Sequence, residues 1–245
     1  MLGFLKKEKI SMQKMNTIDF VDEVMSTIKA FTANLSPTDS LRILFEIENR
    51  IYQLQGQESI RYGNGIHTKH KHLKYHDFFI ENIPPYSKVL DIGCGNGALT
   101  FDISKKVNNV TVYGIDCIKN NIEYAEKHFK ADNITYVCGD ALKDLPNMTF
   151  NVIIMSNVLE HIEHRVEFLK KLKRVYNPQK ILLRVPIFER DWRVPLKEEL
   201  GIDYRLDQTH FIEYRQDEFW KEIKEAGLEV DHFVVQWGEI WAEVC

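Results

Sequence analysis

Short apolar runs and amphipathic stretches alternate along the chain from residue 88 onward. Apolar runs with the length of buried strands occupy 88–92, 110–115, 134–137, 150–155 and 181–185. Apolar side chains recur at helical spacing between them, over 98–107, 118–129 and around 168–175. This alternation predicts a doubly wound α/β domain with a mostly parallel sheet and helices on both faces. We expect a last helix and an antiparallel strand pair to complete seven strands, over 215–226, 230–235 and 240–244.

The first sixty residues predict two helices. The first has Thr17 as its expected cap and an apolar face of Val21, Val24, Met25, Ile28 and Phe31. The second has Ser36 as cap, then Pro37 and Asp39, and an apolar face of Leu41, Leu44, Phe45 and Ile51. We therefore predict a helical extension over 1–66, as a lid, a dimer surface or a packing element, and a larger domain over 67–245.

Composition narrows the functional classes. The chain has 245 residues, 44% of them hydrophobic, enough for one sizeable α/β domain. A net charge of −4 gives no global electrostatic reason to expect nucleic-acid binding. The start of the chain lacks a signal peptide and no stretch is long and apolar enough to span a membrane, so we expect a cytoplasmic protein. The four dispersed cysteines are interpreted as reduced small packing residues.

The stretch KVLDIGCGNGALT, residues 88–100, carries the first chemical signal. Asp91 ends an apolar strand, and three glycines at alternate positions follow it. Glycine permits positive φ and close backbone approach to a ligand, so the turn predicts a nucleotide-type cradle. The expected cofactor-binding residues here are Asp91, Gly93, Cys94 and Gly95. Asp116, with Cys117 after it, ends the next strand, where an acid can accept hydrogen bonds from ribose hydroxyls.

The spacing of the glycines separates two classes of cofactor. In the dinucleotide fingerprint the third glycine comes one residue later than it does here. The string D-x-G-C-G-x-G resembles motif I of the class I S-adenosylmethionine (SAM) dependent methyltransferases, and GDAL at 139–142 and SNVLEHIEH at 156–164 extend the resemblance over about 75–245. The resemblance implies a Rossmann-like fold and SAM as cofactor. It also implies that Asp140 faces the adenine amino group, with Ala141, Leu142 and Asn157 beside the cofactor.

The resemblance also points to catalytic residues. Ubiquinone-pathway O-methyltransferases and small-RNA terminal ribose methyltransferases carry E-x-x-E-H after the fourth strand, and the acids and histidine can hold a divalent cation. Here Asn157 takes the first position, before Glu160 and His161, and His210 lies in a similar context to a later histidine of the RNA-modifying group. The trio Glu160, His161 and His210 is therefore expected to form a divalent metal site, for example for Mg²⁺, or a general base with its partner, or a structural contact.

Basic residues suggest how an acceptor is bound. Residues 187–212 are long for a strand-to-helix connection and are interpreted as an acceptor-binding insertion. Arg184 lies inside an apolar strand, where an unpaired guanidinium is unfavourable, so an acid or an anionic ligand should meet it. The expected acceptor-binding residues are His67, Lys69, His70, Arg184, Arg190 and Arg193. For the stretch around His67–Lys74, a solvated helix start is the alternative interpretation.

Together these features predict a SAM-dependent methyltransferase that modifies an oxygen of a small polar metabolite, phosphorylated or linked to a nucleotide. The C-terminal part resembles bacterial methyltransferases, some encoded among genes for surface polysaccharide or sugar-nucleotide synthesis. The alternatives are an RNA ribose 2′-O-methyltransferase, a non-catalytic SAM-binding protein and an NAD-dependent oxidoreductase. A monomer or a homodimer is expected, without a nucleic-acid or membrane partner.

Overall fold

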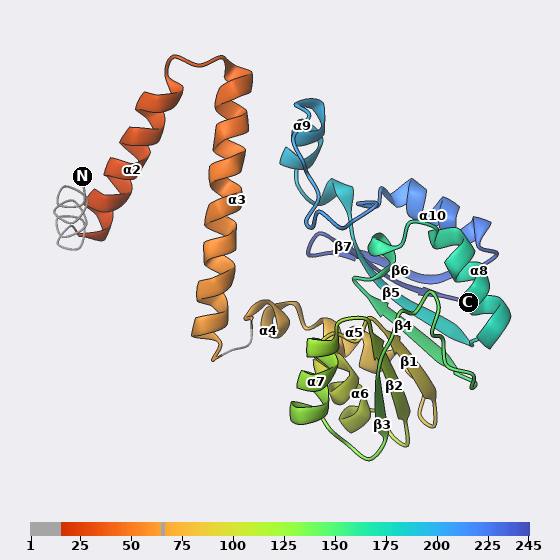
Figure 1. Ribbon diagram of the computed structural model, residues 1–245. Coiled ribbons are helices and arrows are strands. Elements are labelled where there is room, and N and C mark those ends of the chain that lie inside the picture. Colours follow the sequence, from red (N-terminus) through yellow and green to blue (C-terminus); the bar gives the residue numbers. More distant parts are fainter. Residues whose placement is uncertain (1–15, 65–66) are drawn as a thin grey trace. The chain divides into compact units, whose positions relative to one another are not determined.

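A computed structural model describes residues 16–64 and 67–245 of the chain (Figure 1). The chain divides into two compact units, Met1–Asn64 and Gly65–Cys245. The division lies close to the predicted boundary between the helical extension and the larger domain. Each unit is described by itself below.

The larger unit is built on a seven-stranded sheet with the order β3-β2-β1-β4-β5-β7-β6. All neighbouring strands from β3 to β5 are parallel, whereas β7 is antiparallel to both β5 and β6. The strands are β1 (Lys88–Ile92), β2 (Thr111–Asp116), β3 (Ile134–Cys138), β4 (Val152–Ser156), β5 (Lys180–Pro186), β6 (Val230–Gln236) and β7 (Glu239–Val244). The predicted α/β fold, its seven strands and the closing antiparallel pair are confirmed.

Two hydrophobic clusters fill the two faces of the sheet. One face packs against α8 (Arg165–Tyr176) and α10 (Gln216–Glu225), and the other against α5 (Tyr75–Glu81) and α6 (Ala98–Lys106). Because side chains alternate across a strand, Leu182 joins the second cluster while Ile181 and Leu183 join the first. The helix α7 (Lys119–His128) contacts β2 and β3. This doubly wound arrangement brings the carboxyl ends of β1, β4 and β5 to one edge, where ligands bind in such sheets.

The connections contain short elements that periodicity did not predict. α4 (Lys69–Leu73) precedes α5, and Lys74 between them has a positive φ of 51°. The predicted insertion 187–212 contains the 3-10 turn η2 (Phe188–Arg190) and the helix α9 (Arg193–Glu199). The loop after β4 contains the 3-10 turn η1 (Leu159–His161).

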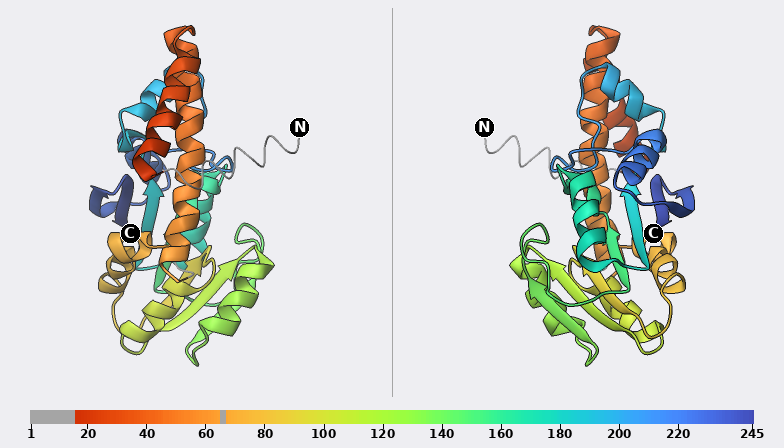
Figure 2. Two further views of the ribbon diagram at one scale, coloured as in Figure 1. Left: turned by 90° about the vertical axis from the view of Figure 1, so that its left-hand side faces the viewer. Right: turned by 90° about the vertical axis from the view of Figure 1, so that its right-hand side faces the viewer.

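Residues 16–64, the described part of the smaller unit, contain the helices α2 (Thr17–Thr32) and α3 (Pro37–Tyr62), which run in opposite directions and are joined by a short turn (Figures 1 and 2). Ser36 caps α3 as predicted, because its side chain accepts a hydrogen bond from the backbone N–H of Asp39. The prediction of Thr17 as the first cap is wrong. Asn16 holds that position, and its Oδ1 accepts from the N–H groups of Ile18 and Asp19 at 3.0 Å.

The cysteines are all free thiols, but the prediction that they are packing residues holds for one of them. Cys94 is buried beside the glycine turn, whereas Cys117, Cys138 and Cys245 are exposed. Strand ends at the edge of an open sheet meet solvent, so their position in the pattern did not imply burial. Within the described ranges, no helix has the length and apolarity needed to cross a membrane.

Candidate functional site

The glycine turn after β1 is built as a cradle. Gly93, Gly95 and Gly97 all have positive φ, and the N–H groups of Gly93 and Cys94 both donate to the carbonyl of Ile115 on β2. Space around Gly95 is open, since a Cβ on this residue would meet nothing within 4 Å. An open backbone turn at the start of a helix is a geometry that can accept a nucleotide-type ligand. The structure therefore places the motif where the sequence predicted it.

Two aspartates support this turn. Asp91 is buried, and its Oδ2 accepts a hydrogen bond from Thr100 Oγ1 at 2.6 Å. Burial raises the pKa of Asp91 to about 7, against the opposing effect of this hydrogen bond. Asp116 at the end of β2 accepts from the N–H of Gly95 through one oxygen and from the N–H of Ile118 through the other. Asp116 thus ties the turn after β1 to the end of β2, the position expected for a ribose-binding acid.

The end of β3 carries the predicted adenine-side residues. Asp140 accepts from the N–H of Leu142 at 2.9 Å and pairs with Lys143 at 2.9 Å, and this pairing with Lys143 lowers the pKa of Asp140. Ala141 packs against the first hydrophobic cluster, while Leu142 is exposed. Asp140 is held as an ionised acid at the same sheet edge as Asp116.

A valine joins the cofactor turn to the loop after β4. A Cβ built on Gly93 would lie 2.4 Å from Cγ2 of Val158, so the two segments are in direct contact. Asn157, just before it, has a positive φ of 55° and donates its N–H to the carbonyl of Arg184 at 2.7 Å. The segment that carries Glu160 and His161 is thereby fixed beside the glycine turn. No motif or spacing in the sequence indicates this role of Val158.

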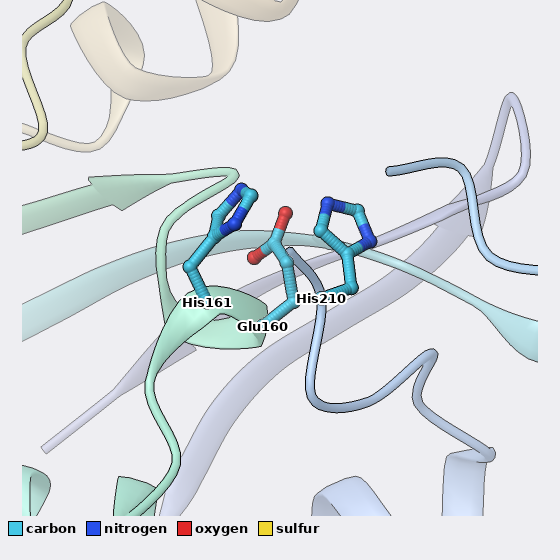
Figure 3. Close-up of side chains that lie close together, drawn as sticks. All are labelled: Glu160, His161 and His210. Atoms are coloured by element: carbon cyan, nitrogen blue, oxygen red, sulfur yellow. The ribbon is translucent and has the colours of Figure 1, made fainter. Parts of the chain in front are cut away.

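Glu160, His161 and His210 come together as predicted (Figure 3). One ligand atom from each lies within 4.8 Å of the others, and the two imidazole rings lie edge to face with their centroids 4.5 Å apart (Figure 3). The N–H of Phe211 donates to the carbonyl of Glu160 at 2.8 Å, which connects the His210 loop to η1. These two loops are distant in sequence, so this backbone contact assembles the cluster.

The Glu160 carboxyl is buried with no hydrogen-bond partner on either oxygen among the described residues. Burial raises its pKa to about 8. His161 is exposed, and desolvation together with the nearby His210 lowers its pKa. A buried carboxyl without partners is rare in proteins, which makes this cluster the candidate site for a ligand or a reaction.

Each histidine is oriented by a second residue. His210 Nδ1 lies 2.8 Å from Oε1 of the buried Glu213, and His161 Nδ1 lies 2.9 Å from Thr209 Oγ1. In both rings this leaves Nε2 available for a ligand. Glu213 is itself held by Arg190 at 2.7 Å. The role of Glu213 was missed in the sequence, although its spacing of three residues from His210 could have indicated it.

The predicted acceptor-binding arginines have different surroundings. Arg190 donates to Glu213 and to the carbonyls of Ile187 and Tyr204, so its guanidinium organises the insertion. Arg193 pairs with Asp191 at 2.6 Å. Arg184 is buried at the carboxyl end of β5 and meets Glu239 at 3.1 Å, which supplies the acid that its position required.

The basic stretch lies partly against this site. His70 Nδ1 is 2.8 Å from the hydroxyl of Tyr75, and desolvation with neighbouring cations lowers the pKa of His70 to about 4. His70 is therefore neutral at pH 7, and His67 also has a lowered pKa because of desolvation. Lys69 is exposed and is the lysine of this stretch whose charge interacts with Arg184 and Glu239.

Comparison with known proteins gives a consistent family. A model of the family described as "Methyltransferase domain" matches residues 85–206. The chain is 33% identical over 112 residues to the mitochondrial ubiquinone biosynthesis O-methyltransferase of Saccharomyces cerevisiae. The matched region is 44% of this chain and 35% of that protein. It is 32% identical over 130 residues to a probable cobalt-precorrin-6B C(15)-methyltransferase of Methanococcus maripaludis, covering 51% of this chain and 67% of that protein. The chain thus spans about a third of the yeast relative and two thirds of the archaeal one.

Solved structures share the fold at lower identity. The small RNA methyltransferase HEN1 matches with a TM-score of 0.58 and 18% identity, over 70% of this chain and 24% of that one. The magnesium protoporphyrin IX methyltransferase of Synechocystis matches with a TM-score of 0.56 and 17% identity, over 77% of this chain and 85% of that one. The sequence relatives agree with the glycine turn and with the acids after β2 and β3. The chain therefore belongs to the class I SAM-dependent methyltransferases.

Proposed function

We propose that this protein transfers the methyl group of SAM to an oxygen of a small-molecule acceptor. The observation that carries the proposal is the cluster of Glu160, His161 and His210, fixed beside the cofactor turn by the contact between Val158 and Gly93. Methyl transfer from a sulfonium is an in-line displacement, so the enzyme has to align the acceptor and remove the proton of its hydroxyl. An imidazole beside the cofactor turn supplies the second requirement.

His210 is the proposed general base. Its Nδ1 faces the carboxylate of Glu213, so the N–H of that nitrogen donates to Glu213 and Nε2 is left to accept the proton of the acceptor. Glu213 then stabilises the imidazolium that forms. His161 and the buried Glu160 lie beside His210 and orient the acceptor hydroxyl (Figure 3). The charge of the sulfonium disappears during transfer, which favours a site with little water.

The same residues fit a divalent cation. Two imidazole nitrogens and one carboxylate oxygen can point at a common centre, and the Glu160 oxygens have no other partner among the described residues. Asn157 is not part of this set, since its Oδ1 accepts from Arg184 Nε at 3.1 Å. A donor set with two histidines suits Mn²⁺, Fe²⁺, Co²⁺ or Zn²⁺ better than Mg²⁺. A cation bound there would act as a Lewis acid on the acceptor hydroxyl.

The cofactor half of the proposal is tested by calorimetric titration with S-adenosylhomocysteine, with NAD⁺ as the alternative ligand. We expect the wild-type protein to bind S-adenosylhomocysteine and not NAD⁺. Asp116→Ala should weaken this binding at least tenfold, because Asp116 both holds Gly95 and accepts from the ribose. Binding of NAD⁺ in place of S-adenosylhomocysteine would overturn the assignment.

The catalytic half is tested by following S-adenosylhomocysteine release with a panel of hydroxylated metabolites that includes phosphorylated and nucleotide-linked sugars. His210→Ala and His161→Ala should lower turnover by about 10²–10⁴-fold with cofactor affinity unchanged. Glu213→Gln, the matched change in the orienting residue, should give a smaller loss of about 10–100-fold. Repeating the assay with EDTA and then with Mn²⁺ or Mg²⁺ distinguishes a metal from a plain base. Full activity of His210→Ala would contradict the proposed role.

A further inference from the structure

Arg184 has hydrogen-bonding capacity that the described part of the chain leaves unused. The residue is 4% exposed and lies on the face of β5 that looks toward α5. Its Nε lies 3.1 Å from both Glu239 Oε2 and Asn157 Oδ1, whereas Nη1 is buried with no hydrogen-bond partner among the described residues. A buried guanidinium nitrogen without a partner is unfavourable, so a further acceptor at this place would stabilise it.

The guanidinium is held in a fixed plane. Its central carbon lies 3.7 Å from the centroid of the Tyr75 ring, and the Tyr75 hydroxyl is bonded to His70 Nδ1 at 2.8 Å. Stacking of this kind fixes the orientation of the fork of N–H donors. A planar, pre-oriented guanidinium matches the two oxygens of a carboxylate or of a phosphate.

Positive charge exceeds negative charge around Tyr75. Lys69 lies close enough to Arg184 and Glu239 to interact with both charges, and desolvation together with repulsion from Arg184 lowers the pKa of Lys69. Glu239 is the acid that pairs with Arg184, and it also accepts from Trp241 Nε1. The histidines that face Tyr75, His70 and His76, both have lowered pKa values because of desolvation, so they add no positive charge near pH 7. Asp102, the acid hydrogen-bonded to His76, is paired with Lys106. Lys69, Arg184 and Glu239 therefore leave one net positive charge for a ligand.

We propose that Lys69, Tyr75 and Arg184 form a subsite, named here the basic subsite, that binds a carboxylate or phosphate group of a ligand. This inference rests on the proposed function. Strand β5 is separated from the cofactor strand β1 by β4, which places the subsite on the acceptor side. Asn157 connects Arg184 to the loop of Glu160, so an anionic acceptor held here has its hydroxyl near the catalytic cluster. The carboxylate of SAM itself is the other source of the same chemistry.

The test is calorimetric titration of inorganic phosphate into the free protein and into protein saturated with S-adenosylhomocysteine. The variants are Lys69→Gln, Arg184→Gln and Glu239→Gln, with Lys71→Gln on the same short helix as the control. For an anionic acceptor, we expect phosphate to bind the saturated protein and to bind Lys69→Gln and Arg184→Gln at least tenfold more weakly. Glu239→Gln should bind phosphate more tightly, because it removes the competing acid. Lys71→Gln should bind phosphate like the wild type.

The two sources of the anion give different results. If the carboxylate of SAM occupies the subsite, phosphate binds the free protein alone, and Lys69→Gln weakens binding of S-adenosylhomocysteine but not of 5′-methylthioadenosine. The subsite is disproved if phosphate binds neither form, or if Lys69→Gln and Lys71→Gln behave alike. Lys69→Gln keeps the test valid should Arg184→Gln fail to fold. Failure of the wild type to bind S-adenosylhomocysteine would instead disprove the proposed function, with the phosphate titration still measuring the subsite.

Discussion

At the scale of single residues, the candidate site contains buried carboxyl groups, among them Asp91 and Glu160. Asp91 is 1% exposed and has one side-chain hydrogen bond, from Thr100. In the unfolded chain its pKa is near 3.8, and in the folded protein burial raises it to about 7. Between these values the folded state binds more protons than the unfolded state. The stability of the cofactor-free protein should therefore fall as the pH rises from about 4 to about 7.

Asp91→Asn should remove this dependence. The pKa difference corresponds to about 4 kcal/mol of unfolding free energy lost by the wild type over that range. We expect urea unfolding at pH 5 and pH 8 to show a smaller loss of stability for Asp91→Asn than for the wild type. Asp132→Asn, a change of an exposed acid, should retain the wild-type difference. Equal pH dependence in all three proteins would contradict the raised pKa.

At the scale of elements, the turn between β1 and α6 combines backbone conformation with close packing. Gly97 has φ of 83°, and a Cβ there would lie 2.6 Å from Tyr136 Oη and 2.7 Å from Ala125 Cβ. The position is therefore restricted to glycine for two independent reasons: positive φ and contact with β3 and α7. The first reason is readable from the spacing of the glycines, and the second is visible in the structure alone.

Gly97→Ala should destabilise the protein by about 2–4 kcal/mol, the sum of overpacking and backbone strain. It should also weaken binding of S-adenosylhomocysteine, since the cradle has to move. Gly201→Ala is the matched control, because Gly201 has φ of 65° but open space around it. That change should destabilise by about 1 kcal/mol and leave cofactor affinity unaltered. Urea unfolding and calorimetry measure both effects, and equal losses for the two variants would disprove the steric argument.

The N-terminal helices form where their amphipathic pattern predicts them, but their apolar faces are almost entirely exposed. No residue of α2 is buried, and in α3 Phe45 is the buried residue. Helices that bury so little are marginal in water by themselves. The roles of lid and dimer surface stay predictions.

Separate fragments should behave differently. A fragment of residues 65–245 should unfold cooperatively in urea, because both hydrophobic clusters lie within it. A fragment of residues 16–64 should show low helicity by circular dichroism at micromolar concentration. A stable, concentration-independent helical signal from the small fragment would contradict this expectation.

At the scale of the whole molecule, charge bears on the RNA alternative. The net charge is −4, and the basic groups near the site are either paired or few in number. Affinity for a nucleic-acid backbone grows with the number of phosphates neutralised and falls steeply with salt. The balance of charge favours a small anionic acceptor over RNA.

Single-stranded RNA should therefore bind weakly, with a Kd of about 10⁻⁴ M or weaker at physiological salt. Fluorescence anisotropy at 50 and 200 mM salt measures this directly. Submicromolar affinity with a steep dependence on salt would support the ribose methyltransferase alternative instead.

The sequence by itself determined the α/β fold class, the succession of the main strands and helices along the chain, and the cofactor turn. These are local properties: apolar periodicity, glycines that permit positive φ and an acid at a strand end are encoded in neighbouring residues. The motifs also indicated Glu160, His161 and His210 as one group of candidate catalytic residues. The expected pairing of Arg184 with an acid followed from the unfavourable energy of burying an isolated charge.

The tertiary structure decided which side chains contact Arg184 and His210, and how burial changes the pKa of titratable side chains. Glu239 on β7 meets Arg184, Tyr75 stacks on its guanidinium, and Glu213 orients His210. None of these contacts follows from periodicity, because each depends on which segments the sheet order places side by side. Desolvation likewise depends on tertiary burial, and it leaves His70, inside a run of basic residues, neutral at pH 7.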